Sequence, residues 1–214
     1  MKIFIDFDDV ILNTKDFSGG LKIFFESHEV SPELFKKHYY DPNDTSEVKL
    51  FDPDGLLSRL EENEKMDVTA LRRGLSQHLA DMDSFVFADV DDFLNFVGKE
   101  NAYLISFGLP SFQNEKIIGS GIDRLVSGCV VTKGSKAEAI KSVIEKMKID
   151  VNEEMIFIDD RLEQIQDIKK TFPNMHTFLL CRKEGRYCDQ KNGYCDFEVH
   201  DLEEAMEIIK SLIK

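Results

Sequence analysis

Short apolar runs alternate with amphipathic stretches over the second half of the chain, and one further run opens it. Each run is continuous rather than alternating, which is typical of strands buried on both faces of a parallel sheet. The predicted strands are 2–5 (KIFI), 102–105 (AYLI), 124–131 (RLVSGCVV), 155–158 (MIFI) and 176–180 (HTFLL).

Helical periodicity fills the intervals between these strands. In 135–148, for example, Ile140, Val143, Ile144 and Met147 recur at the spacing of one helix face. Three more helices are predicted over 89–101, 161–172 and 201–213. Strands that alternate with helices predict an α/β fold, in which a Rossmann-like, doubly wound parallel sheet of about five strands lies between helical layers.

The segment 15–86 departs from this rhythm, because it has helix starts but no convincing strand. Ser31 and Asp52 are predicted N-caps, since each precedes a proline and then an acid. Asp67 can cap a third helix in the same way. We therefore predict an all-helical insert at 15–86, with the catalytic core formed by 1–14 and 87–214. Its aromatic residues are expected to form the insert's own core.

The charge balance excludes some classes of partner. The chain has 27 basic and 41 acidic residues, for a net charge of −14. With no long basic run, a nucleic-acid surface is disfavoured. No apolar stretch approaches the roughly 18 residues of a membrane span, and no signal pattern opens the chain. We therefore expect a cytoplasmic protein, a monomer or homodimer, with no membrane or nucleic-acid partner.

Three of the four cysteines fall in the segment 181–195 (CRKEGRYCDQKNGYC). Their spacing differs from the CxxC pairs of zinc sites, so reduced thiols are expected. Glycine, asparagine and charged residues predict an exposed hairpin or loop near the sheet's edge, where Arg182 or Lys183 would flank the site.

Polar side chains follow the predicted strands at the point where each strand ends. Asp6 and Asp8 follow the first strand, Ser106 follows the second, and Asp159 and Asp160 follow the fourth. The carboxyl ends of parallel strands meet at one edge, where open α/β sheets bind their ligands. Clustered carboxylates repel each other unless a cation joins them, and Mg²⁺ is held by a few carboxylates together with water and phosphate. The sequence therefore predicts a magnesium site beside a phosphorylated ligand.

These residues also suit phosphoryl transfer. A carboxylate can attack phosphorus and form an acyl phosphate. Residues two apart in an extended segment point to the same side, so Asp8 can protonate the leaving oxygen while Asp6 attacks. A serine hydroxyl and a lysine ammonium, from Lys133 or Lys136, would hold the phosphoryl oxygens.

The order acid–x–acid, serine, lysine and paired aspartates resembles the four motifs of the haloacid dehalogenase (HAD) superfamily. The matching stretches are DFDDVIL (6–12), LISFG (104–108), TKGSKAEAI (132–140) and FIDDR (157–161). The resemblance covers about 2–14 and 88–214. The helical insert occupies the place of this superfamily's type 1 cap.

The resemblance implies a role for each motif residue. Asp6 would be the nucleophile and a Mg²⁺ ligand, and Asp8 the general acid and base, which also binds the metal through its backbone carbonyl. Ser106 and a lysine would bind phosphoryl oxygens; Lys136, which opens a helix as in many relatives, is preferred to Lys133, which stays open.

The remaining motif positions complete the expected site. Asp160 would finish the metal site with support from Asp159. Phe107 and Gly108 are expected to bind substrate beside Ser106 and Lys136. The implied activity is a Mg²⁺-dependent phosphatase that acts on a small phosphorylated metabolite or nucleotide through an aspartyl-phosphate intermediate.

Several alternatives remain. A phosphomutase or phosphotransferase would use the same intermediate, and a non-catalytic phosphate-binding protein would keep the same fold. A dehalogenase is disfavoured, because that chemistry in the superfamily does not use the second acid, here Asp8. A phosphoryl-accepting receiver places its acids in another order, and the absence of a GxxxxGK[ST] motif argues against a P-loop enzyme.

Overall fold

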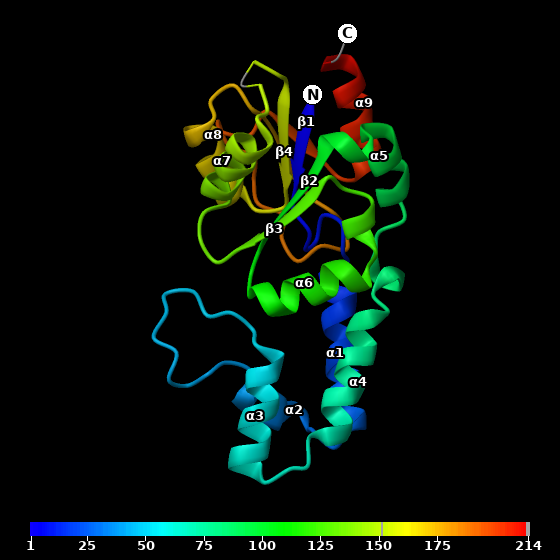
Figure 1. Ribbon diagram of the computed structural model, residues 1–214, viewed down its shortest axis with the longest axis vertical. Coiled ribbons are helices and arrows are strands. Elements are labelled where there is room, and N and C mark those ends of the chain that lie inside the picture. Colours follow the sequence, from blue (N-terminus) through cyan, green and yellow to red (C-terminus); the bar gives the residue numbers. More distant parts are fainter. Residues whose placement is uncertain (151, 213–214) are drawn as a thin grey trace.

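A parallel sheet forms the centre of the protein in the computed structural model, which describes residues 1–150 and 152–212 (Figure 1). Within these residues the sheet has six strands in the order β3-β2-β1-β4-β5-β6. The strands are β1 (Lys2–Ile5), β2 (Ala102–Phe107), β3 (Gly128–Thr132), β4 (Met155–Asp159), β5 (His176–Leu180) and β6 (Phe197–Val199). The predicted α/β class is confirmed, and β6 adds a strand that the sequence did not predict.

Helices cover both faces of the sheet, as expected for a doubly wound fold (Figure 1). Side chains alternate along β1: Phe4 packs with α7 (Lys136–Met147) and α8 (Leu162–Thr171). Ile3 and Ile5 pack in a second cluster with α5 (Val90–Val97) and α9 (Leu202–Leu212). Both faces of each central strand are therefore buried, which explains the continuous apolar runs.

The chain between β1 and α5 is helical and lies beyond the carboxyl ends of the strands, below the sheet in Figure 1. It contains α1 (Thr14–Ser27), α2 (Pro32–His38), α3 (Pro53–Glu64) and α4 (Thr69–Ala80), followed by the 3₁₀ turn η1 (Asp83–Phe85). None of residues 15–86, all of them described, belongs to a strand of the sheet. That this segment forms a separate domain stays a prediction.

The predicted helix caps of this segment are largely confirmed. The side chain of Ser31 accepts from Leu34 N, and that of Asp52 accepts from Gly55 N. Asp67 was wrongly expected as the third N-cap, because α4 begins one residue later. Asp67 lies two residues before the helix, and its side chain accepts a hydrogen bond from the backbone N of Thr69, the first residue of α4.

Two predicted boundaries were wrong. The strand predicted at 124–131 begins only at Gly128, because Gly121 adopts a left-handed conformation (φ 74°) and the 3₁₀ turn η3 (Ile122–Arg124) follows. The helix predicted at 89–101 ends at Val97, because Gly98 has φ 81° and the 3₁₀ turn η2 (Lys99–Asn101) follows it. In the last helix, the predicted end at 213 lies outside the described residues.

The sequence did not predict α6 (Pro110–Gly119), which lies across the carboxyl edge between the sheet and the helical segment (Figure 1). Among the helices described, none has the length and apolar character to span a bilayer.

Candidate active site

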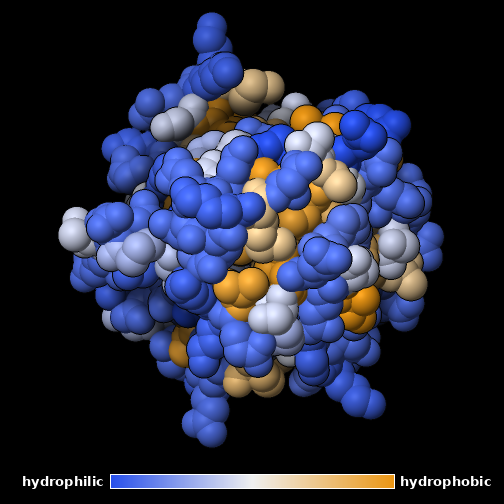
Figure 2. Space-filling view, turned by 90° about the horizontal axis from the view of Figure 1, so that it is seen from below, coloured by the Kyte–Doolittle hydropathy of each residue, from blue (hydrophilic) through white to orange (hydrophobic). Residues whose placement is uncertain are grey.

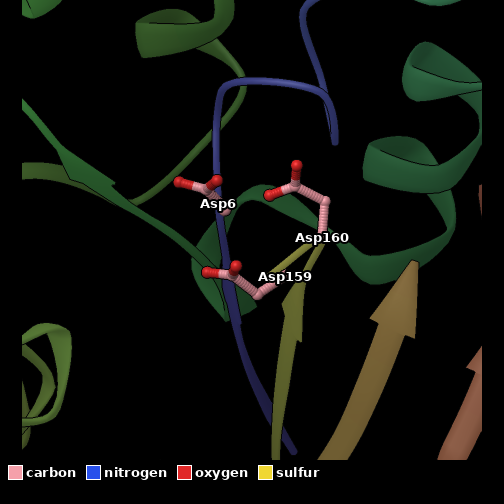
Figure 3. A group of neighbouring side chains, drawn as sticks. All are labelled: Asp6, Asp159 and Asp160. Carbon is pink, nitrogen blue, oxygen red and sulfur yellow. The ribbon is translucent and has the colours of Figure 1, made fainter. Parts of the chain in front are cut away.

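Three acids converge where the two central strands end (Figure 3). Asp6 follows β1, Asp159 ends β4, and Asp160 comes next. Each offers one carboxylate oxygen within 4.8 Å of the other two, and all three residues are buried. The strand order reverses at β1 and β4, since β2 and β3 lie on one side and β5 and β6 on the other. The cluster therefore lies at the switch point where sheets of this class bind ligands.

Lys136 supplies positive charge to this cluster. Its Nζ lies 2.6 Å from Asp6 Oδ1 and donates at 2.7 Å to Asp159 Oδ2. Ser135 caps α7 by accepting from two backbone amides, which fixes Lys136 at the first helical position. Burial by itself would lower the pKa of Lys136, but the carboxylates of Asp159 and Asp6 raise it above its ordinary value. Lys136 is therefore a permanent cation here, whereas Lys133 is exposed.

One lysine does not neutralise three buried carboxylates. Burial raises the pKa of Asp160, and the neighbouring charges of Asp159 and Asp6 raise it further. Burial also raises the pKa of Asp6, against the opposing attraction of Lys136. Carboxyl groups in this arrangement bind a further cation, either a proton or a metal ion.

The donor set fits a hard divalent cation. Both oxygens of Asp159 have protein donors, because Oδ1 accepts from Arg161 N at 2.9 Å and Oδ2 accepts from Lys136. Asp160 Oδ2, in contrast, is buried without a hydrogen-bond partner among the described residues. Asp160 thus has an oxygen free to bind a metal ion, whereas Asp159 holds the lysine in place and Asp6 shares that lysine through its Oδ1.

Asp8 lies in a second, adjoining cluster that the sequence only partly predicted. Its Oδ1 accepts from Lys116 Nζ at 2.5 Å and from Thr14 Oγ1 at 2.9 Å, and its Oδ2 accepts from Gln113 Nε2 at 2.7 Å. Gln113 Nε2 also lies 3.0 Å from Ser106 Oγ. Gln113 therefore joins the second acid to the serine at the end of β2.

The electrostatic environment of Asp8 differs from that of Asp6. Burial alone would raise its pKa, but the charge of Lys116 and the hydrogen bonds from Lys116 and Gln113 lower it to about 2. Lys116 is itself buried, with its Nζ 5.4 Å from the ring centres of Phe7 and Phe17. Asp8 is therefore ionised, whereas burial and neighbouring acids raise the pKa values of Asp6 and Asp160.

Lys116 and Gln113 were missed because they lie on α6, which was not predicted. They are three positions apart on one face of that helix, and Lys116 Nζ donates to Gln113 Oε1 at 2.8 Å. Pro110 at the first helical turn was the available sequence signal, since proline favours that position.

Gly108 has a steric role beside this cluster. Its φ is 156°, and a Cβ atom there would lie 2.7 Å from Gln113 Cγ. A larger residue would displace the amide that holds Asp8 and Ser106. Phe107 and Gly108 both line the adjacent cavity.

Asp9 and Arg186 close the rim of the site. Asp9 takes a left-handed conformation (φ 60°) in the turn after β1, and Arg186 Nε donates to its Oδ2 at 2.5 Å. Arg186 belongs to the segment 181–195 and lines the cavity. The sequence predicted that Arg182 or Lys183 would flank the site; Arg186 lines the cavity instead, and Arg182 pairs with Asp89 and with the carbonyl of Val10.

The segment 181–195 is a loop that contains no strand of the sheet, so the hairpin alternative was wrong. The four cysteines, all among the described residues, are free thiols. Within the described residues, the cluster of candidate metal-binding side chains is the aspartate trio, and it contains no cysteine.

A cavity of about 900 Å³ opens from Asp8 toward the helical segment. Its walls come from α1, α2, α6 and the connection between α2 and α3. Of the aromatic residues expected in the core of the insert, Phe25 and Phe35 are buried there. Phe35 also lines this cavity, together with Tyr39 and Tyr40.

Comparisons with known proteins support the fold. No protein-family model and no curated protein sequence matches the chain significantly. Solved structures do match over almost the whole length. A haloacid dehalogenase-like hydrolase from Burkholderia xenovorans superposes with a TM-score of 0.76 at 19% identity, covering 99% of this chain and 97% of that one.

Two further structures are similar in the same way. The HAD-hydrolase YfnB from Bacillus subtilis, bound to magnesium, gives a TM-score of 0.63 at 16% identity and covers 97% of each chain. The L-2-haloacid dehalogenase from Xanthobacter autotrophicus gives 0.60 at 11% identity and covers 98% of each chain. The coverage includes the helical segment, so the fold of this chain as a whole is the HAD-like hydrolase fold.

Proposed function

Because this chain has the fold of the haloacid dehalogenase-like hydrolases from end to end, we propose that it is a member of that superfamily. We propose further that it is a Mg²⁺-dependent phosphatase that acts on a small phosphorylated metabolite or nucleotide. The observation that carries this proposal is the buried trio of Asp6, Asp159 and Asp160 at the switch point of the sheet, with Lys136 against it.

The metal would be held by the carboxylates of Asp6 and Asp160 and by the backbone carbonyl of Asp8. The free oxygen of Asp160 and the raised pKa values of Asp6 and Asp160 support this assignment. Bound there, Mg²⁺ would neutralise charge that develops on the phosphoryl oxygens. The similar structure from Bacillus subtilis is bound to magnesium.

Asp6 is the proposed nucleophile. One of its carboxylate oxygens would bond to phosphorus while the bond between phosphorus and the leaving oxygen breaks, which gives an aspartyl phosphate. The leaving oxygen would take a proton from Asp8. In the second half, Asp8 would accept a proton from water as that water attacks phosphorus, which releases inorganic phosphate and restores the Asp6 carboxylate.

Asp8 is ionised in the present arrangement, as the second half of the reaction requires. To act as an acid in the first half it must take up a proton, and a phosphate dianion at the site would favour this by opposing the charge of Lys116. Lys136 and the Ser106 hydroxyl would bind the phosphoryl oxygens. Ser106 is fully buried at the end of β2, so only a group that enters beside Asp6 and Asp8 would reach it.

Asp8 separates this proposal from a dehalogenase. Its two oxygens hold three separate hydrogen bonds, from Lys116, Thr14 and Gln113, so the side chain is fixed at the cavity. Displacement of a halide needs no proton donor at this position, whereas an alkoxide leaving group does. A mutase or phosphotransferase would share the first half of the reaction and differ in the acceptor.

Release of inorganic phosphate from an aryl phosphate, with Mg²⁺ and with a chelator, tests the proposal. The wild type should release phosphate only with the metal, and Asp6→Asn should release none. No release by the wild type, or full release by Asp6→Asn, would overturn the proposed function. Glu145→Gln, on the exposed side of α7, is the control for an acid-to-amide change.

A further inference from the structure

The cavity beside Asp8 has a continuous wall of aromatic rings, which we call the aromatic wall: Phe112, Phe51, Tyr39 and Phe35. It begins on α6, next to Gln113, with Phe112 against Phe51 at a centroid distance of 5.4 Å and nearly at right angles. Phe51 then stacks on Tyr39 at 4.4 Å and 17°, and Tyr39 contacts Phe35 at 5.4 Å. The wall thus leads from the catalytic acids toward the outer helices.

The aromatic wall borders the cavity on one side and the hydrophobic core on the other, since Phe35 and Phe112 are buried members of that core. All four residues line the cavity, and Phe51 and Tyr39 are only half-buried. Figure 2, seen from below in Figure 1, shows apolar side chains near the middle of this end of the molecule, with hydrophilic ones around them. The volume of about 900 Å³ is near the upper end for small-molecule sites and leaves room for a leaving group much larger than phosphate.

The charges around the cavity favour an anion. Lys22, Lys36 and Lys49 line it on the side of the helical segment, and Arg186 lines it at the rim. Apart from Asp8, Glu26 is the one acid among the described lining residues. This local excess of positive charge stands in a chain with a net charge of −14, so it attracts anions against the overall field.

The cavity offers few charged acceptors to a polyhydroxylated leaving group. Each sugar hydroxyl donates a hydrogen bond, and buried donors without acceptors are costly. Carboxylate acceptors are limited to Asp8, which has three donors already, and Glu26. Ring faces, in contrast, bind flat π systems with little loss of side-chain freedom.

We propose that the substrate is a phosphate monoester whose leaving group carries a flat aromatic ring system, which stacks on the aromatic wall while the phosphate lies at Asp6. This inference rests on the proposed phosphatase function and names its substrate class. Phe51 is the central specificity residue, because it contacts both Phe112 and Tyr39.

Matched substrates test the ring directly. Adenosine 5′-monophosphate and ribose 5-phosphate share the sugar phosphate and differ in the aromatic base. 2-Phenylethyl phosphate and butyl phosphate make the same comparison without a sugar. Stacking on protein rings contributes about 1–3 kcal/mol per base, so kcat/KM should favour the ring-bearing member of at least one pair by roughly tenfold or more. The pair with the larger ratio tells a nucleotide from a simple aryl compound.

A substitution in the aromatic wall then tests whether the wall causes the preference for ring-bearing esters. Phe51→Leu should lower the ratio of the two kcat/KM values by roughly three- to tenfold. Because both values come from one preparation, a loss of folded protein cancels in the ratio. Phe96→Leu, the same change on α5 of the core, is the matched control and should keep the ratio of the wild type.

The possible outcomes distinguish a wrong substrate class from a wrong phosphatase function. If the wild type hydrolyses phosphate esters but shows no preference in either pair, or if Phe51→Leu keeps the preference, the substrate class is wrong and the phosphatase stands. If the wild type hydrolyses neither an aryl phosphate nor any of the four esters, the phosphatase is wrong. Calorimetric titration of the wild type with adenosine 5′-monophosphate and ribose 5-phosphate then decides the ring site: tighter binding of the nucleotide upholds it, and equal binding overturns it.

Discussion

The ammonium group of Lys116 lies 2.5 Å from Oδ1 of Asp8, although the two residues are 108 positions apart in the chain. The lysine is buried, and the aspartate accepts further hydrogen bonds from Gln113 and Thr14. Asp8, the second acid of the first motif, is thus held by residues of α6, a helix that belongs to none of the four motifs. In the proposed mechanism, Lys116 therefore holds the general acid in place as well as stabilising the fold.

Lys116→Met should therefore destabilise the protein, because it leaves the partly buried Asp8 carboxylate without its cation. Breaking such a pair costs about 3–5 kcal/mol, measured as the free energy of unfolding in urea. Lys210→Met, which removes an exposed pair with Glu207, should cost less than about 1 kcal/mol. The double variant Asp8→Asn/Lys116→Met should recover part of the loss, and strictly additive losses would contradict the pairing.

Lys136, rather than Lys133, should be essential for activity. Lys136 reaches Asp6 and Asp159, whereas Lys133 is exposed. Loss of one group that stabilises the transition-state charge lowers kcat by a factor of about 10²–10³. The kcat of Lys136→Met should therefore be lower than that of the wild type by that factor. Lys133→Met should stay close to the wild type in the same phosphate-release assay. The reverse ranking would move the phosphoryl site to the other lysine.

Asp160→Asn should act in opposite directions with and without metal. In chelator it should raise the melting temperature by about 2–4 °C, because one of three crowded carboxylates is removed. Magnesium should stabilise the wild type, by about 2.7 kcal/mol at 100 times the dissociation constant, and should stabilise Asp160→Asn much less. Equal metal stabilisation of the two proteins would place the ion elsewhere. Glu145→Gln controls for the loss of an exposed acid.

The sequence was sufficient to predict those site residues that come at or just after the end of a buried strand. Asp6, Ser106 and Asp159 could be placed because apolar runs mark strands, and parallel strands bring their carboxyl ends to one edge. Lys116 and Gln113 could not, because α6 turns these polar residues inward, beside Phe112, and so lacks a clear apolar face. β6 was missed because it is three residues long and depends on pairing with β5.

His78 should make the stability of the helical segment depend on pH. Its ring stacks against Phe17 and Phe24, its Nε2 has no hydrogen-bond partner among the described residues, and burial lowers its pKa. The folded state therefore binds fewer protons than the unfolded state once the pH falls below the unfolded pKa of about 6.5. Stability due to the neutral ring is present above that pH and is lost as the pH falls toward the folded pKa.

Unfolding curves of the wild type and His78→Phe between pH 7.5 and 5.5 measure this contribution. The wild type should lose more stability than the variant over this interval, because phenylalanine takes up no proton. His200→Gln, which alters an exposed imidazole, should follow the wild type. Parallel curves for the wild type and His78→Phe would refute the assigned role of His78.

The aspartyl phosphate formed on Asp6 in the proposed mechanism can be trapped. The protein is mixed with Mg²⁺ and a phosphate ester, quenched in acid within one turnover, digested and mapped by mass spectrometry. We expect a phosphoryl group on the peptide that contains Asp6, and none in Asp6→Asn. A phosphoryl group on another residue, or phosphate release with Asp6 replaced, would contradict that mechanism.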